Sequence, residues 1–282
     1  MTIRHIAVLG AGTMGHGIAH AAIAAGYPTR MFDIADASLK KATAAIDAII
    51  GKGVELGKVP SGEADAMRAR LTTTSKIEDA LAGVDFVIEA APERVDLKLA
   101  LLADVDRFAP ASAIVATNTS ALSITELAGS MKHPSRVAGM HFFNPVHKMK
   151  LIEIVQALES GPETLQAIED VSRQMGKETV LVRESPGFIT TRVNASIGNE
   201  AFYMLMEGVA SARDIDKALK LGLNHPMGPF ELVDLVGLDT RLSILDYLHK
   251  SMGEKYRPCP LLVQYVKAGR LGRKTGRGVY EY

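Results

Sequence analysis

The residues best suited to acid–base chemistry are a histidine and a glutamate that lie twelve positions apart, His141 and Glu153. His141 follows the apolar run 137–140, which predicts a buried strand, and Asn144-Pro145 ends that strand because proline cannot donate to a sheet. Glu153 lies within the apolar segment 151–155, where a buried carboxylate is costly unless it has a partner. We predict a His-Glu pair that acts as a general base, as the oxidation of an alcohol requires. The alternative is a structural histidine and a glutamate that faces solvent.

A glycine-rich turn near the N-terminus predicts a dinucleotide site. The apolar run 6–9 leads into this turn, and apolar residues then recur at helical spacing. In such a strand–turn–helix unit, the glycines permit a tight turn, a close approach of the pyrophosphate, and close packing of helix on strand. The helix N-terminus presents free N–H groups to the phosphates. We expect the cofactor to contact Gly10, Ala11, Gly12, Thr13, Met14 and Gly15.

An acidic residue follows at the end of the second predicted strand, 29–34. Asp33 lies eighteen residues after Gly15, where a carboxylate can accept hydrogen bonds from the ribose hydroxyls of adenosine and repel a 2′-phosphate. The sequence therefore favours NAD over NADP. Two alternatives stay open: an acidic loop residue without a ligand, and an NADP preference in which Arg30 binds the 2′-phosphate.

The next elements alternate between strand and helix, which is typical of an α/β domain with a mainly parallel sheet. Ligands of such sheets bind beyond the carboxyl ends of the strands, where Glu93, Lys98 and Ser120 are expected. Ser120 could equally cap a helix that starts near Ile124. The predicted strands are 84–89, 113–117, 137–141, 151–155 and 179–182, and the predicted helices are 36–56, 63–71, 95–108 and 163–175.

The pattern changes at Ser185-Pro186-Gly187-Phe188. Ser185 is predicted to be an N-cap, with Pro186 in the first helical position. From there only helices are expected, except for a possible strand at Val279-Tyr280. We therefore predict two domains, a Rossmann-type domain of residues 1–184 and an all-helical domain of residues 185–282. The predicted helices of the second domain are 188–206, 212–220, 229–236, 239–249 and 261–268.

The composition argues against several kinds of partner. The 32 basic residues balance the 32 acidic ones, so nothing favours long-range attraction to nucleic acid or to an anionic membrane. The single cysteine, Cys259, cannot form an intrachain disulfide, which indicates a reducing compartment. The histidines show no metal-ligand spacing, and no apolar run approaches a membrane span or a leader peptide. We expect a cytoplasmic protein without a metal.

Several motifs together resemble the L-3-hydroxyacyl-CoA dehydrogenases over essentially the whole chain, and most closely their bacterial 3-hydroxybutyryl-CoA branch. The resemblance implies an NAD-binding domain followed by a helical domain that dimerises, with an acyl-CoA substrate between them. It also implies reversible oxidation of a (3S)-3-hydroxyacyl-CoA to the 3-ketoacyl-CoA, with a short substrate such as 3-hydroxybutanoyl-CoA. The motifs are the glycine turn, Asn118-Thr119-Ser120, His141-Phe142-Phe143-Asn144-Pro145, Ser185-Pro186-Gly187-Phe188, Pro226-Met227-Gly228-Pro229 and Gly272-Arg273-Lys274-Thr275-Gly276.

The resemblance also assigns roles to single residues. His141 would be the catalytic base and Glu153 its orienting partner. At a substrate-binding position, where the family usually has asparagine, this chain has Thr191, whose side chain is shorter. Ser120 and Asn144 would contact the substrate or the nicotinamide, and the NAD-contacting positions would be Asp33, Glu93, Lys98 and Lys274.

Two other functions remain open from the sequence. A dehydrogenase for a hydroxy acid without CoA, such as a sugar acid, could use the same His-Glu pair. A protein that binds NAD without turnover belongs to a different class and would be expected to lack this pair, whereas His141 and Glu153 are both present.

Overall fold

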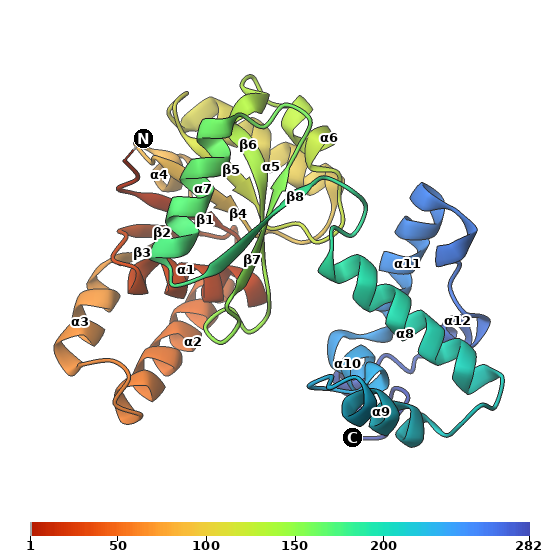
Figure 1. Ribbon diagram of the computed structural model, residues 1–282. Helices are drawn as coiled ribbons and strands as arrows, with labels where there is room; N and C mark the ends of the chain where they lie inside the picture. The colour runs from red at the N-terminus through yellow and green to blue at the C-terminus, as the bar shows by residue number, and fades with distance from the viewer. Residues whose placement is uncertain (1) are drawn as a thin grey trace. The chain divides into compact units, whose positions relative to one another are not determined.

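The computed structural model describes residues 2–282 and divides the chain into two compact units (Figure 1). The first ends at Glu184 and holds a mainly parallel sheet with helices, while the second, Ser185–Tyr282, is helical. This architecture confirms the predicted fold class. It follows from the change in periodicity near residue 185, where buried strands give way to amphipathic helices.

One eight-stranded sheet organises the first unit, with the strand order β3-β2-β1-β4-β5-β6-β7-β8. All neighbours pair in parallel except β6 and β7, which are antiparallel. The connection 143–150 between them is shorter than the roughly dozen residues that a parallel crossover needs. The strands are β1 (Ile6–Leu9), β2 (Thr29–Phe32), β3 (Leu71–Thr74), β4 (Phe86–Glu89), β5 (Ile114–Thr117), β6 (Val137–Phe142), β7 (Leu151–Gln156) and β8 (Glu178–Arg183).

Helices cover both faces of the sheet. Figure 1 shows α7 across the near face, with α5 and α6 behind the strands. Helices α1, α2, α3 and α7 share one hydrophobic core with the sheet, and α6 packs on β6 from the other side. The helices are α1 (Thr13–Ala24), α2 (Asp36–Glu55), α3 (Ser61–Ala69), α4 (Ile77–Leu81), α5 (Val95–Phe108), α6 (Ile124–Gly129) and α7 (Pro162–Gln174), with a 3₁₀ turn at Pro134–Arg136.

The two-residue period of the strands separates apolar from polar side chains. Met140 and Phe142 belong to the core beneath α1 and α7, so His141 between them points to the opposite face. Ile152 and Ile154 flank Glu153 in the same way. By this alternation Glu89 and Thr117, at the carboxyl ends of β4 and β5, also face the side that α6 covers. Strand geometry thus gathers four polar side chains on one face.

The second unit packs five helices around an aromatic and aliphatic core that includes Phe202 and Phe230, whose rings meet edge to face. Asp216 accepts hydrogen bonds from the Phe230 and Glu231 amides at the start of α10 (2.8 and 3.1 Å). The helices are α8 (Thr190–Met206), α9 (Ala212–Gly222), α10 (Pro229–Val236), α11 (Leu238–Met252) and α12 (Pro260–Lys267), with 3₁₀ turns at Glu254–Tyr256 and Arg273–Thr275.

Two expectations for the second unit are wrong. Val279-Tyr280 is not a strand, because both amides donate to the carboxylate of Asp234 (2.8 and 2.9 Å) instead of to another strand. Ser185 does not cap a helix, since α8 begins only at Thr190. Gly187 and Phe188 have φ angles of 72° and 50°, which a right-handed helix cannot contain.

The sequence also missed an edge strand and misplaced a strand end. Strand β3 is the polar stretch Leu71–Thr74, only partly buried, and therefore has no apolar run to reveal it. Strand β2 ends at Phe32, and Ile34, predicted to lie in it, is 85% exposed. Both errors arise because side chains in an edge strand and at the end of a strand are less buried. The apolar pattern that predicts a strand depends on burial and is therefore weak there.

A half-buried imidazole lies beside the β6–β7 connection. The ring of His20 on α1 meets that of His147 edge to face, at 6.3 Å between centroids. Its Nδ1 atom is buried and has no hydrogen-bond partner among residues 2–282. Burial, aided by the neighbouring His147 and Lys177, lowers the pKa of His20 from 6.5 to about 4. A proton on this ring would therefore oppose the folded state.

We expect His20 to make the protein sensitive to mild acid. The pKa of His20 is lower in the folded than in the unfolded chain. Its contribution to the free energy of unfolding is therefore full above pH 6.5 and is lost as the pH falls toward about 4. The loss is at most about 3 kcal/mol. Urea unfolding at about pH 7.5 and about pH 4.5 should show a smaller difference in the free energy of unfolding for His20→Leu than for the wild type. Equal differences for the two proteins would contradict this assignment.

Candidate active site

The histidine and the glutamate that the sequence singles out form a pair in the structure. Strands β6 and β7 place His141 directly opposite Glu153, and Nδ1 of the ring lies 2.7 Å from Oε2 of the carboxylate. The two side chains are 6% and 0% exposed, which excludes a glutamate that faces solvent. Because a carboxylate can only accept, Nδ1 carries the proton and Nε2 of a neutral ring keeps its lone pair. The arrangement can therefore accept a proton at Nε2.

Ser120 lies at the other ring nitrogen. Its Oγ is 3.1 Å from Nε2 of His141, and the hydroxyl can donate to the lone pair there. The N-cap of α6 is Ser123, whose Oγ accepts from the amide of Glu126 at 3.1 Å. Ser120 is therefore not the helix cap that the sequence left open. A substrate hydroxyl placed beside both Ser120 and His141 would meet a hydrogen-bond donor and a base at once.

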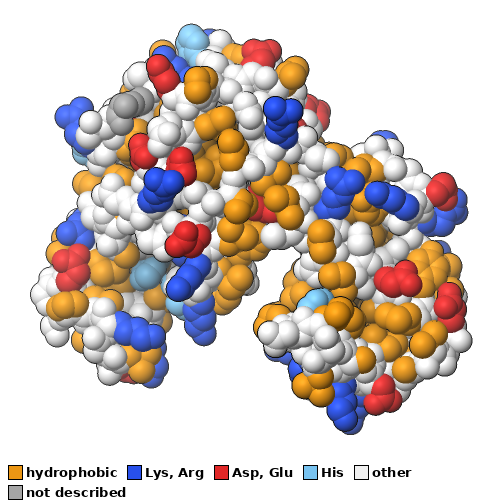
Figure 2. Space-filling view, viewed as in Figure 1, with side chains coloured by type: hydrophobic (Ala, Val, Ile, Leu, Met, Phe, Trp, Pro, Cys, Tyr) orange, Lys and Arg blue, Asp and Glu red, His pale blue; other side chains and the backbone are white. Residues whose placement is uncertain are grey.

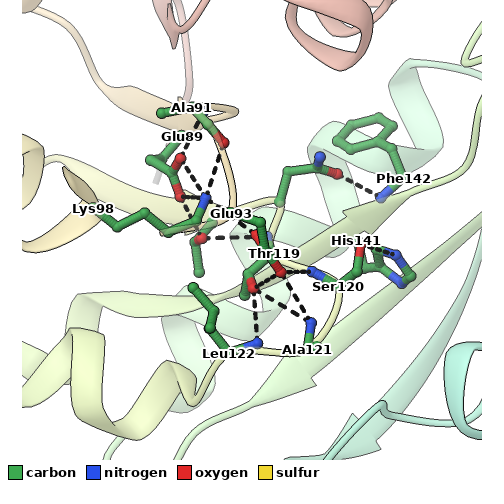
Figure 3. A network of polar contacts seen from close by, with 12 residues as sticks. Glu89, Ala91, Glu93, Lys98, Thr119, Ser120, Ala121, Leu122, His141 and Phe142 are labelled. Atoms are coloured by element: carbon green, nitrogen blue, oxygen red, sulfur yellow. Dashed lines mark hydrogen bonds and ion pairs between the residues drawn. The ribbon is translucent and has the colours of Figure 1, made fainter. Parts of the chain in front are cut away.

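A polar network holds the loops beside Ser120 (Figure 3). The Oε1 atom of Glu93 lies 2.8 Å from the Ser120 amide, and Nζ of Lys98 forms an ion pair with Glu89 at 2.7 Å. Lys98 and Glu89 are 1% and 0% exposed, whereas Glu93 is 41% exposed. The predicted contacts of Glu93 and Lys98 with NAD stay predictions. Sequence reasoning gave no role to Glu89, although a carboxylate that ends an apolar strand was a usable signal.

A second missed residue ties the ends of two strands together. Asn118 follows β5, and its Oδ1 accepts from the amide of Phe142 at 2.9 Å. This bond fixes the strand end that carries His141 against the loop that carries Ser120. Asn118 belongs to the Asn-Thr-Ser motif, but its position alone could not distinguish a ligand contact from this structural bond.

The glycine turn has the shape that a dinucleotide requires. Gly10 has a φ of 109°, and a Cβ on Gly15 would come within 1.8 Å of the Gly10 carbonyl oxygen. No atom lies within 4 Å of the Cβ position of Gly12, so the backbone there is open to a ligand. Helix α1 begins at Thr13 without a side-chain cap, which leaves its first N–H groups available for phosphates. Bound pyrophosphate fits this turn.

The carboxylate of Asp33 is held beside the same turn. Its Oδ2 accepts from the amide of Ala11 at 2.9 Å and its Oδ1 from that of Ala35 at 3.0 Å. The neighbouring Ile34 is exposed. Arg30 is engaged elsewhere, since its guanidinium donates to the carbonyl oxygens of Asp79 and Ala82.

The remaining predicted site residues lie in other parts of the fold. Asn144 is exposed two residues beyond β6 and is joined to Pro145 by a cis peptide bond. Thr191 is the second residue of α8, and Lys274 pairs with Asp239 at 2.6 Å. Thr191 and Lys274 belong to the second unit, so the contacts predicted for them stay predictions.

Residues 2–282 contain neither a cluster of metal ligands nor a helix that could span a membrane. No group of three or more histidine, cysteine, aspartate or glutamate side chains within this range could hold a metal ion. No helix in the described part of the chain is both long enough and apolar enough to span a membrane.

Comparisons with known proteins agree over both units. The model of the 3-hydroxyacyl-CoA dehydrogenase NAD binding domain matches residues 5–185, and that of the 3-hydroxyacyl-CoA dehydrogenase C-terminal domain matches residues 187–282. A probable 3-hydroxybutyryl-CoA dehydrogenase from Bacillus subtilis is 45% identical, covering 100% of this chain and 98% of the relative. The crystal structure of (S)-3-hydroxybutyryl-CoA dehydrogenase from Ralstonia eutropha has a TM-score of 0.96 at 42% identity, covering 100% and 99% of the two chains. The chain therefore belongs to the 3-hydroxyacyl-CoA dehydrogenase family of NAD-dependent oxidoreductases.

Proposed function

We propose that this chain catalyses the reversible oxidation of (3S)-3-hydroxyacyl-CoA to 3-ketoacyl-CoA, with 3-hydroxybutanoyl-CoA as a short-chain substrate. The observation that carries the proposal is the series of contacts from Glu153 through His141 to Ser120, with distances of 2.7 and 3.1 Å. The short chain is supported by relatives named 3-hydroxybutyryl-CoA dehydrogenase, among them one from Clostridioides difficile that is 40% identical over 98% of this chain and 99% of its own length.

The reaction needs one proton acceptor at the substrate hydroxyl. That hydroxyl binds beside both Oγ of Ser120 and Nε2 of His141, and Nε2 takes its proton as the C3–O bond gains double-bond character. The Glu153 carboxylate, buried against Nδ1, stabilises the imidazolium and keeps the ring oriented. NAD, when bound, accepts the hydride that leaves C3. In the reverse direction, His141 returns its proton to the ketone oxygen.

We propose NAD rather than NADP as the cofactor. The backbone of residues 10–15 would hold the pyrophosphate, and the Asp33 carboxylate would accept hydrogen bonds from the adenosine ribose. A 2′-phosphate would meet this carboxylate at close range and be repelled. Arg30, the residue that kept NADP open, already donates to two carbonyl oxygens, which supports the NAD assignment.

We further propose that the protein is a cytoplasmic homodimer that binds neither nucleic acid nor membranes. Figure 2 shows hydrophobic side chains exposed on the visible face of the helical unit. Exposed apolar surface of this kind is typical of subunit contacts. The single cysteine is buried and free, which suits a reducing compartment. Large apolar side chains exposed in this unit are Ile189, Val193, Met206, Val209, Leu221, Leu223, Leu235 and Val236.

Replacement of the base should abolish most turnover. We expect His141→Gln to lower kcat by about 10²–10⁴-fold, because glutamine cannot take the hydroxyl proton. The measurement is the initial rate of acetoacetyl-CoA reduction, followed by NADH absorbance. Circular dichroism and NADH binding should match the wild type, which separates lost chemistry from lost folding. Near wild-type turnover by a folded variant would refute the role of His141.

Cofactor choice should depend on one carboxylate. We expect Asp33→Ser to raise kcat/KM with NADPH relative to NADH, because the repulsion of the 2′-phosphate is removed. The shift should be on the order of 10-fold or more, as expected for loss of a close like-charge contact. Rates with each reduced nicotinamide provide the ratio. Unchanged selectivity would show that Asp33 does not discriminate between the cofactors.

The dependence on CoA can be tested with substrates alone. We expect acetoacetyl-CoA to be reduced with a far higher kcat/KM than free acetoacetate, because binding of the remote CoA group lowers the barrier at C3. Longer 3-ketoacyl-CoA esters then give the chain-length preference. Comparable rates with free acetoacetate would instead favour a hydroxy-acid dehydrogenase that does not use CoA.

A further inference from the structure

A buried carboxylate anchors the loops on which the proposed active site rests. Glu89 ends β4 and is 0% exposed. Its Oε1 accepts from the amide of Ala91 at 2.7 Å, and its Oε2 accepts from the Thr117 hydroxyl at 2.6 Å. Lys98 on α5 donates to both oxygens at 2.7 and 2.8 Å. One side chain therefore joins β4, β5 and α5 at the edge of the sheet where ligands bind.

Lys98 connects this anchor to a second carboxylate. Its ammonium also lies 3.6 Å from Oε2 of Glu93, and it donates to the carbonyl oxygen of Ala91 at 3.3 Å. Lys98 is 1% exposed, so its charge acts at short range in a poorly solvated place. Glu93 is itself 41% exposed, and this attraction helps to hold its carboxylate. The buried ion pair therefore holds an exposed carboxylate in one position.

The other oxygen of Glu93 collects donors from the Ser120 turn, as Figure 3 shows. Its Oε1 accepts from the Thr119 hydroxyl at 2.6 Å, from the Ser120 amide at 2.8 Å, and from the Ala121 amide at 3.2 Å. Hydrogen bonds to an ionised acceptor are stronger and shorter than those between neutral groups. Glu93 thus fixes the backbone of the residue whose hydroxyl lies 3.1 Å from His141.

We infer that Glu93 is a positioning residue for the proposed reaction, acting through Ser120, and that the Glu89–Lys98 pair keeps Glu93 in place. The inference rests on the proposed function, since the position of Ser120 affects the rate only if a substrate oxygen binds to Ser120 and His141 together. A displacement of the reacting groups by about 1 Å can lower the rate of a reaction roughly 10²-fold. The three hydrogen bonds to Oε1 of Glu93, which fix the Ser120 turn, can therefore affect the rate. This role differs from a contact with the cofactor, which would act without Ser120.

A double-mutant cycle distinguishes the two roles. The proteins are the wild type, Glu93→Ala, Ser120→Ala and the double variant, each assayed for acetoacetyl-CoA reduction and for NADH affinity by fluorescence titration. We expect Glu93→Ala to lower kcat on the order of 10-fold in the wild-type background, and less than about 2-fold when Ser120 is already alanine. The kcat is measured at saturating NADH, so that a change in the Kd of NADH, which the predicted contact of Glu93 with NAD would cause, does not enter the comparison. Glu93→Gln should recover part of the loss, because its amide oxygen can still accept from the turn.

Two controls make the result specific. Glu159→Ala removes an exposed carboxylate in the same unit, outside the network, and should leave every parameter unchanged. Thermal unfolding of each variant excludes loss of folded protein.

Each remaining outcome has one meaning. Equal losses in kcat from Glu93→Ala in both backgrounds would overturn the positioning role in favour of a cofactor contact alone. Wild-type rates for Glu93→Ala would overturn it as well, while the proposed function would stand if Ser120→Ala and His141→Gln were still impaired. A wild-type protein that does not reduce acetoacetyl-CoA would overturn the proposed function and this inference with it.

Discussion

The antiparallel pairing of β6 with β7 is the constraint on which the candidate site depends. In an otherwise parallel sheet, this one reversal places His141 directly opposite Glu153, so the two side chains meet without any loop having to position them. A shift of register by one residue would turn the glutamate to the other face and put an isoleucine in its place. The orientation of the imidazole ring thus follows from strand geometry.

Among the described residues of this domain, the carboxylates of Glu89 and Glu153 are buried, and each has a different kind of partner. Glu89 meets a lysine, a hydroxyl and an amide, which together satisfy it and make it a structural anchor. Glu153 meets an imidazole that need not be charged, so its stabilising effect grows when the ring gains a proton. Similar burial therefore gives rigidity in one place and, in the proposed reaction, supports proton transfer in another. The difference lies in whether the partner is permanently charged.

The sequence predicted secondary structure correctly where buried apolar residues recur with the period of a strand or a helix. The prediction failed where that pattern is missing. The strands of the sheet interior, the glycine turn and the helices of the second unit all carry strong patterns. The edge strand β3 carries none, because it is polar and partly exposed. The turn at Ser185 resembles a helix start in its residue types, yet left-handed backbone at Gly187 and Phe188 delays the helix to Thr190. Residue types indicate which backbone conformation is preferred, whereas the dihedral angles also depend on the surrounding structure.

The sequence by itself determined the fold class, the family and the identity of the His-Glu pair, because these depend on residue types at fixed spacing along the chain. Tertiary structure decided which nitrogen of His141 faces Ser120, which oxygens of Glu93 hold the turn, and that Lys98 is committed to a buried glutamate that no motif had marked. The reason is physical: hydrogen bonds and desolvation depend on distances between residues far apart in the chain, and these distances exist only after the strands have paired.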